Sequence, residues 1–256
     1  MNVIIFSKDR PAQLDLLLRS MSRFWPQSDD IDVKILWMAT SVDYVAGYHK
    51  LYRDENRCWF MQGKFKPDLI AMIDPLDQHT MFLCDDDVFI GPYTTDLSPL
   101  DDPNVLTISL RLNPHLTHCQ PSAGSSVAHS PHPGEIWWQA SIGDYSYPMS
   151  LNGHIFRTSD ILPILKSHDY QNPNELEVVM DRNTPNRPII KCYDRTTVLN
   201  LPINQVQTAW ENPHGNVSAE WLNEQFLGGK VIDLEPYVGY LNTACHEILP
   251  VKLITP

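Results

Sequence analysis

The sequence predicts an α/β fold with a mainly parallel, Rossmann-like sheet and helices on both of its faces. Short apolar runs, each typical of a buried strand, alternate with segments whose apolar residues recur at helical spacing. These segments follow a β-α-β-α-β-α-β order, which is the order that parallel strands joined by crossover helices require. The predicted strands are 2–7, 33–39, 58–61 and 80–84, and the predicted helices are 11–23, 41–52 and 67–73.

The ends of these segments carry the expected local signals. Pro11 falls in the first turn of the first helix, where its fixed φ is favourable and its missing N–H is not needed. Thr40 or Ser41 can cap the second helix through a side-chain oxygen. The turn at residues 7–10 therefore lies at the carboxyl end of the first strand, which is where open α/β sheets bind ligands.

The regular pattern stops after one more predicted strand, Val105–Leu112. Residues 113–150 are rich in Pro, Ser, Gly and His, and an irregular segment of this length is usually functional or mobile. We expect it to cover a bound ligand, with Trp137 and Trp138 offering flat apolar surfaces. A structural zinc site is not favoured, because no second Cys-x-x-Cys or His-x₃-His cluster completes the scattered candidates. These candidates are His115, His118, Cys119, His129 and His132.

Shorter elements follow residue 150. They are a strand at 155–157, a helix from 158 or 159 to 166, a helix entered through 172–177, an extended segment at 198–204 and a helix at 219–226. No repeat, low-complexity tract or clear linker separates them. We therefore expect one domain over residues 1–256, with a sheet-based half at 1–112 and a second ligand-binding half at 113–256.

Composition excludes several classes of partner. The formal net charge of -12 argues against binding to nucleic acid or to anionic lipid through charge alone. No apolar stretch reaches the length of about 18 residues that a membrane span needs. The 5 cysteines are dispersed and form no Cys-x-x-Cys, which predicts buried free thiols in a reducing compartment. We expect a cytoplasmic location.

An acidic triplet is the most informative short motif. Four apolar residues, Met81 to Cys84, run into Asp85, Asp86 and Asp87, and apolar residues then resume. Because side chains alternate along a strand, Asp85 and Asp87 are expected to point one way and Asp86 the other. Such an Asp-x-Asp pair can hold Mg²⁺ or Mn²⁺ together with substrate phosphates. The alternative is a solvated acidic turn.

These residues together resemble the GT-A glycosyltransferases. The turn Phe6-Ser7-Lys8-Asp9-Arg10-Pro11 is similar to the Thr-x-x-Arg turn of that family, and residues 83–87 are similar to its DxD motif. The resemblance covers residues 1–112 at the level of fold. Segments 151–157, 172–177 and 200–204 also look like bacterial family-2-like sugar transferases.

The resemblance implies an enzyme that moves a sugar from a nucleotide-diphosphate sugar, UDP- or GDP-linked, to a saccharide or lipid-linked acceptor. Surface polysaccharide or glycoconjugate synthesis is the expected setting, and residues 113–256 would bind the acceptor. Phe6, Ser7 and Arg10 would contact the nucleotide sugar. Ser7 as a simple turn former and Arg10 as a solvated residue at the helix start are the alternatives.

A metal ion, Mn²⁺ or Mg²⁺, is implied as well. Asp87 is our first choice as direct ligand. Asp85 or Asp86 would reach the ion through water or hold the donor ribose or sugar. His246 is the expected histidine ligand near the end of the chain, although a surface histidine beside Glu247 is an equally good interpretation.

An inverting transferase also needs a general base on the acceptor hydroxyl. Glu177 is preferred, with Glu175 and then Asp144 as alternatives, although both glutamates are also explained by charge complementarity at a helix N-terminus. A retaining enzyme needs no such base. Asn152 and His154 are candidates for sugar binding, and for His154 a buried, hydrogen-bonded role is the favoured interpretation.

Two other functions remain open. One is a sugar-phosphate nucleotidyltransferase, which also uses paired aspartates, although the first turn lacks a Gly-rich phosphate loop with a basic residue. The other is a non-catalytic, carbohydrate-binding relative, which the intact triplet argues against. Peripheral association with a membrane is also left open.

Overall fold

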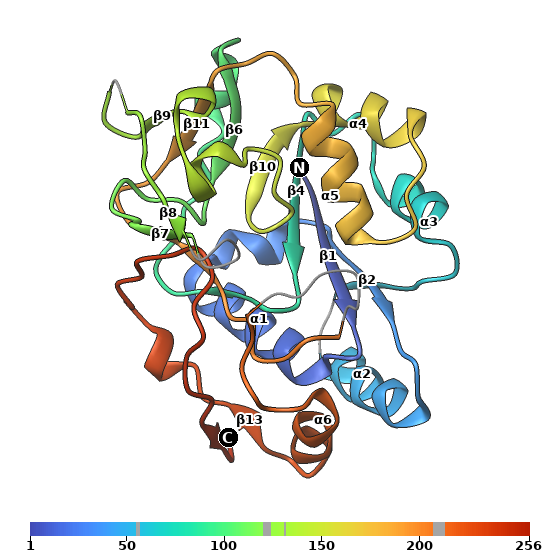
Figure 1. Ribbon diagram of the computed structural model, residues 1–256. Coiled ribbons are helices and arrows are strands. Elements are labelled where there is room, and N and C mark those ends of the chain that lie inside the picture. Colours follow the sequence, from blue (N-terminus) through green and yellow to red (C-terminus); the bar gives the residue numbers. More distant parts are fainter. Residues whose placement is uncertain (55–56, 120–123, 131, 207–212) are drawn as a thin grey trace.

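A computed structural model describes residues 1–54, 57–119, 124–130, 132–206 and 213–256 (Figure 1). Within these residues a sheet of 8 strands forms the centre, in the order β3-β2-β1-β4-β10-β6-β11-β9. Its strands are β1 (Asn2–Lys8), β2 (Val33–Met38), β3 (Cys58–Met61), β4 (His79–Cys84), β6 (Val105–Ser109), β9 (Glu135–Trp137), β10 (His154–Arg157) and β11 (Ile189–Cys192). The helices are α1 (Pro11–Phe24), α2 (Val42–Asp54), α3 (Phe65–Met72), α4 (Thr158–Ser167), α5 (Pro173–Arg182) and α6 (Ala219–Leu227).

Smaller strand pairs lie beside the sheet. They are β5 (Asp87–Phe89) with β12 (Val198–Asn200), β13 (Val231–Ile232) with β14 (Leu253–Ile254), and β7 (His118–Cys119) with β8 (Gly124–Ser125). The β7–β8 pair and β9 give the segment 113–150 some of the local structure that its composition does not predict.

The predicted parallel arrangement is confirmed for the first four strands of the sheet. β1 pairs in parallel with β2 and with β4, and β2 pairs in parallel with β3. The strand order differs from a simple continuation, because β10 inserts antiparallel between β4 and β6. One sheet therefore passes through both the predicted sheet-based half and the predicted ligand-binding half.

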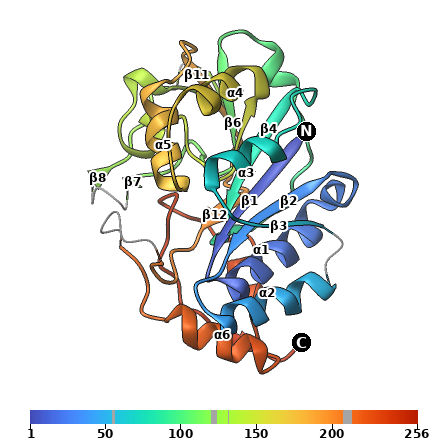
Figure 2. The same cartoon turned by 90° about the vertical axis from the view of Figure 1, so that its right-hand side faces the viewer.

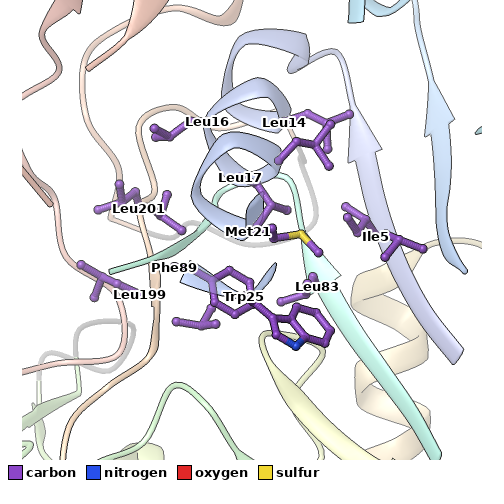
Figure 3. Close-up of a cluster of buried hydrophobic side chains, with 14 of the residues drawn as sticks. Ile5, Leu14, Leu16, Leu17, Met21, Trp25, Leu83, Phe89, Leu199 and Leu201 are labelled. Atoms are coloured by element: carbon purple, nitrogen blue, oxygen red, sulfur yellow. The ribbon is translucent and has the colours of Figure 1, made fainter. Parts of the chain in front are cut away.

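Helices cover both faces of the sheet, as predicted (Figures 1 and 2). Alternation along β1 sends Val3 and Ile5 into a core shared with α1, α2 and α6, and sends Ile4 and Phe6 into a second core shared with α3, α4 and α5. Figure 3 shows part of the first core, where leucines of α1 pack with Trp25 and Phe89. Burial of these apolar side chains on both faces is the main stabilising contribution.

Some boundaries and burial states differ from the sequence-based expectations. β6 ends at Ser109, because the carbonyl of Leu110 accepts bonds from the backbone of residues 197 and 198 and the Ser109 hydroxyl accepts from Leu112 N. All five cysteines are free. Cys119 and Cys245 are buried as predicted, Cys84 and Cys192 are partly buried, and the prediction of buried thiols is wrong for Cys58, which is exposed on the edge strand β3. None of the described helices has the length and hydropathy needed to cross a membrane.

Candidate functional site

A cavity of about 950 Å³ opens where the parallel strands end. Lys8, Met38 and Cys84 close β1, β2 and β4, and all three line the cavity. Parallel strands place their carboxyl ends at one edge of a sheet, so this location follows from the topology and matches the predicted ligand edge. Residues far along the chain complete the lining, among them Glu177 on α5 and His246 beside the acidic triplet.

Arg10 is buried in the wall of the cavity that the strand ends form, called here the strand-end wall. Its Nη1 donates to Asp85 Oδ1 at 3.0 Å and to Asp86 Oδ2 at 2.9 Å. Its Nε donates to Asn204 Oδ1 at 2.9 Å, and its Nη2 donates to the carbonyl of Asn204. Burial by itself would lower the pKa of Arg10, but Asp85 and Asp86 raise it above its ordinary value, so Arg10 is a permanent cation in the site.

Asp85 is almost fully enclosed by donors. Besides Arg10, the Ser7 hydroxyl donates to Asp85 Oδ2 at 2.9 Å and Lys8 N donates to the same oxygen at 3.0 Å. Burial raises the pKa of Asp85, and Arg10 opposes that shift. Ser7 Oγ also lies 2.7 Å from Tyr48 Oη, so the Ser7 hydroxyl is occupied within the protein. Phe6 lines the cavity and stacks on Phe82.

Asp86 is the member of the triplet that both faces the cavity and has room for a ligand. Its side chain is 15% exposed, against 5% for Asp85. Asn200 Nδ2 donates to Asp86 Oδ1 at 2.8 Å, while Arg10 binds the other oxygen. Asp86 is therefore held in one orientation while part of its carboxylate remains open to the cavity.

Asp87 lies behind this surface. It is fully buried, and the described lining of the cavity includes Asp86 but not Asp87. Cys84 N donates to Asp87 Oδ2 at 2.8 Å, and the amides of Asn152 and Asn200 donate to Oδ1 at 3.0 and 3.1 Å. Burial, and then the nearby Asp86, raise the pKa of Asp87 to about 7.

This geometry corrects the predicted pairing of the triplet. A two-residue turn at Asp85–Asp86 separates β4 from β5, so simple strand alternation does not apply. Arg10 joins Asp85 to Asp86, whereas Asp87 turns toward the amides of Asn152 and Asn200. Asp86 is therefore the more exposed, cavity-facing carboxylate, whereas Asp87, the predicted first choice as metal ligand, is buried behind it.

His246 lies beside the triplet, but both of its ring nitrogens have protein partners. Nδ1 is 2.8 Å from Asn200 Oδ1, and Nε2 is 3.3 Å from Nη1 of Arg111. Arg111 in turn lies 3.7 Å from Asp144. Burial and then Arg111 lower the pKa of His246 to about 4, so its ring is neutral at pH 7. In this arrangement the predicted metal ligand serves as a hydrogen-bond partner.

The two candidate bases on α5 differ sharply. Glu177 lines the cavity, and its Oε1 accepts a bond from Leu151 N at 2.9 Å. Burial raises the pKa of Glu177. Its bond to the Leu151 backbone, the charge of Arg111 and its bonds to the Ser150 and Tyr147 side chains oppose that shift.

Glu175 is exposed and does not belong to the described cavity lining. Its N–H donates to Asn172 Oδ1 at 3.0 Å, and its carboxylate accepts from Asn172 Nδ2 at 2.9 Å and from Gln171 N at 2.8 Å. This reciprocal pattern is a capping box at the start of α5. The explanation by helix-terminal charge thus fits Glu175. Of the two glutamates, Glu177, the preferred candidate base, is the one that lines the cavity.

His154 takes the structural role that its sequence context favoured. It is fully buried, with Nδ1 2.9 Å from the carbonyl of Pro148 and Nε2 2.9 Å from Ser109 Oγ. Burial lowers the pKa of His154 to about 3. Asn152, by contrast, lines the cavity and binds Asp87.

Sequence reasoning did not identify several important site residues. Each of them contacts a site residue described above: Tyr48 contacts Ser7, Arg111 contacts His246, Tyr147 contacts Glu177, Asn200 contacts Asp86, and Asn204 contacts Arg10. Asn200 and Asn204 do fall in the segment 200–204, which had been noted as a resemblance without roles for its residues. Nothing in the local pattern around Arg111 marks it, because it follows an ordinary apolar strand.

The residues fit a metal ion only if the substrate supplies most of its ligands. Among the described residues no group of three or more His, Cys, Asp or Glu side chains is placed to hold an ion. Ions such as Mg²⁺ commonly bind through one or two carboxylates plus substrate phosphates, and Asp86 offers one such carboxylate to the cavity.

No protein-family model and no curated protein sequence matches this chain. Solved structures resemble it at low identity. S. aureus TarS is 15% identical with a TM-score of 0.45, over 77% of this chain and 36% of TarS. The bifunctional glycosyltransferase WbbM is 13% identical with a TM-score of 0.37, over 75% of this chain and 38% of WbbM.

An active-site mutant of LgtC is 12% identical with a TM-score of 0.34, over 90% of this chain and 95% of LgtC. A shorter form of TarS in complex with UDP-GlcNAc is also similar, at 14% identity and a TM-score of 0.39, over 76% of this chain and 56% of that one. The chain thus spans about a third to just over half of the TarS structures.

Proposed function

We propose that this protein is a glycosyltransferase that moves a sugar from a nucleotide-diphosphate sugar to a hydroxyl group of a saccharide or lipid-linked acceptor. One observation carries the proposal. A cavity at the carboxyl ends of β1, β2 and β4 holds a fixed, cavity-facing carboxylate, Asp86, on one wall and a partly buried carboxylate, Glu177, on another. The first suits a cation-assisted leaving group and the second suits removal of a proton from an acceptor.

The donor would bind along the strand ends. Phe6, Leu36 and Met38 give the cavity an apolar section that can receive a nucleobase. The diphosphate would then lie toward Asp86, where a divalent cation, Mn²⁺ or Mg²⁺, bound with the phosphates would offset the charge of the departing diphosphate. Arg10 holds Asp85 and Asp86 in place, because it donates to both.

Glu177 would act as the general base in an inverting transfer. Its pKa is raised, which increases its affinity for the proton that the acceptor hydroxyl gives up. Leu151 N and the Ser150 and Tyr147 side chains hold the carboxylate in place. In this step the acceptor oxygen would bond to the anomeric carbon, the bond between that carbon and the diphosphate oxygen would break, and the proton of the acceptor hydroxyl would pass to Glu177.

The test is release of nucleoside diphosphate. The purified chain is incubated with UDP- and GDP-sugars and simple saccharides, with Mn²⁺, with Mg²⁺ and with EDTA. Release that requires the cation and is lost in Asp86→Asn supports the proposal. Parallel reactions with nucleoside triphosphates and sugar phosphates report pyrophosphate, and pyrophosphate release without nucleoside diphosphate release would favour nucleotidyl transfer instead. The cytoplasmic location and membrane docking stay predictions.

A further inference from the structure

Four side chains from distant segments form one continuous hydrogen-bonded chain that ends on Asp86. Arg111 follows β6, His246 belongs to the C-terminal segment, Asn200 closes β12, and Asp86 lies in the turn after β4. The successive contacts are 3.3 Å from Arg111 Nη1 to His246 Nε2, 2.8 Å from His246 Nδ1 to Asn200 Oδ1, and 2.8 Å from Asn200 Nδ2 to Asp86 Oδ1. Asp144, 3.7 Å from Arg111 Nη2, holds the far end.

The direction of every bond in this chain follows from its first member. An arginine side chain has only donors, so Nε2 of His246 must accept. A neutral imidazole has one donor and one acceptor nitrogen, so the proton of His246 is on Nδ1. Nδ1 therefore donates to Asn200, which fixes the oxygen of the Asn200 amide toward His246 and its nitrogen toward the acidic triplet.

That orientation matters because Asn200 faces two carboxylates. Its Nδ2 donates to Asp86 Oδ1 and, at 3.1 Å, to Asp87 Oδ1. The reversed amide would place an oxygen against both acids and would replace two attractive contacts with repulsion. Asp86 accepts from Arg10 on one oxygen and from Asn200 on the other. The orientation of the Asn200 amide therefore sets the direction in which the Asp86 carboxylate faces the cavity.

We propose that Arg111 and His246 are positioning residues for the donor site: they set the orientation of the Asn200 amide and, through it, the direction in which Asp86 faces the donor phosphates and their cation. The identity of that ligand rests on the proposed function. The orientation of the chain itself does not, because it follows from donors and acceptors within the protein. Residues that support a metal-binding carboxylate in this way typically change metal affinity by about 10- to 100-fold.

The first experiment measures the tautomer of His246 in the absence of any ligand. ¹⁵N NMR of the full-length protein distinguishes the two tautomers of a histidine ring, and the signal of His246 is identified by its loss in His246→Gln. We expect the proton on Nδ1 in the wild type and a mixture of tautomers in Arg111→Met, which removes the donor and keeps an apolar stem. A proton on Nε2 in the wild type, or no change in Arg111→Met, would overturn the proposal.

The second experiment measures binding. Titration calorimetry gives the affinities of wild type, Arg111→Met, His246→Ala and His246→Gln for Mn²⁺ with UDP or GDP, and for the corresponding nucleoside alone. We expect about tenfold weaker binding of the metal diphosphate in Arg111→Met and His246→Ala, with the nucleoside unaffected. His246→Gln should recover part of the loss, because its amide can donate to Asn200.

Arg157→Met is the matched control. Arg157 is partly buried and donates to the carbonyl of Val105 and to Asp160, but it lies outside the described cavity lining. It should lower thermal stability without changing metal-diphosphate affinity. Affinities of the Arg111 and His246 variants within twofold of wild type would overturn the proposal. If the wild type binds no nucleotide, the proposed function fails. The NMR result still shows whether the hydrogen bonds from Arg111 through His246 to Asn200 run in the inferred direction.

Discussion

The acidic side chains on the two walls of the cavity are held by different kinds of partner. On the strand-end wall, Asp85 and Asp86 share a buried guanidinium, so their charges are compensated within the protein. On the α5 wall, Glu177 bonds to a backbone N–H and neutral side chains; burial raises its pKa, and these bonds together with the charge of Arg111 oppose that shift. The comparison teaches that similar residues can be held differently. Asp85 and Asp86 bond directly to a guanidinium, although burial still raises the pKa of Asp85 to about 6. Glu177 bonds to a backbone N–H and neutral side chains, and its raised pKa suits it to take up a proton.

The largest effect is expected from removing the compensating cation. Arg10→Met leaves Asp85 and Asp86 without their partner in a buried setting, and breaking a buried ion pair in this way typically costs about 3–5 kcal/mol of stability. Urea unfolding followed by circular dichroism measures the change. Arg10→Lys restores the charge but not the multiple donors, and should recover only part of it. A loss below about 1 kcal/mol in Arg10→Met would mean that the strand-end wall is not compensated as described.

The next effect concerns Glu177 on the α5 wall. Glu177→Gln removes the proton acceptor and keeps its shape, so kcat for sugar transfer should fall by about 10²- to 10⁴-fold with little change in the KM for the donor. In the wild type, kcat should decline as the pH falls through the raised pKa of Glu177, because the protonated form cannot act as a base. Steady-state kinetics across pH check both. A variant as active as wild type would point to Asp144 or to a retaining mechanism.

A third effect concerns His154, which lies outside both walls. Its pKa is about 3 in the folded protein, well below the ordinary value of 6.5, so the unfolded chain binds the extra proton first. Stability is therefore fully present above about pH 6.5 and falls by about 1.4 kcal/mol per pH unit as the pH drops toward 4. Urea titrations at several pH values measure the slope. His154→Gln should show a slope smaller by about one proton; an unchanged slope would assign the effect to other groups.

The smallest effect comes from the neighbour of Glu177 on the same helix. Glu175→Gln should leave kcat within about twofold and lower stability by no more than about 1 kcal/mol, because Glu175 belongs to the capping box. Thermal unfolding and the same kinetic assay measure these quantities, with Glu177→Gln as the matched partner. A large loss of activity in Glu175→Gln would remove the distinction between the two glutamates.

The first part of the fold could be predicted because its signals are local. The apolar runs gave β1 to β4, and the strand order along the chain placed residues 7–10 and the acidic triplet at one sheet edge. The insertion of β10 beside β4 could not be predicted, since pairing between residues about 75 apart leaves no periodic signal in either segment.

The site was predictable in location and less so in detail. The role of Asp87 depends on two amides, Asn152 and Asn200, that lie 65 and 113 positions away, and only tertiary contacts reveal them. The role of Glu175 was legible, because Asn172 three residues earlier forms the sequence pattern of a capping box. His246 lies near the triplet, its role as a metal ligand stays a prediction, and its partner Arg111 was not foreseen.

The late position of β10 also bears on how the protein is made. Its residues, His154–Arg157, fill the gap between β4 and β6. A nascent chain that has emerged only to residue 112 therefore carries strand edges with open N–H and C=O groups, a known route to aggregation. We expect a fragment cut at residue 112 to need chaperones or to precipitate, because the ribosome must deliver more than forty further residues before the sheet can close.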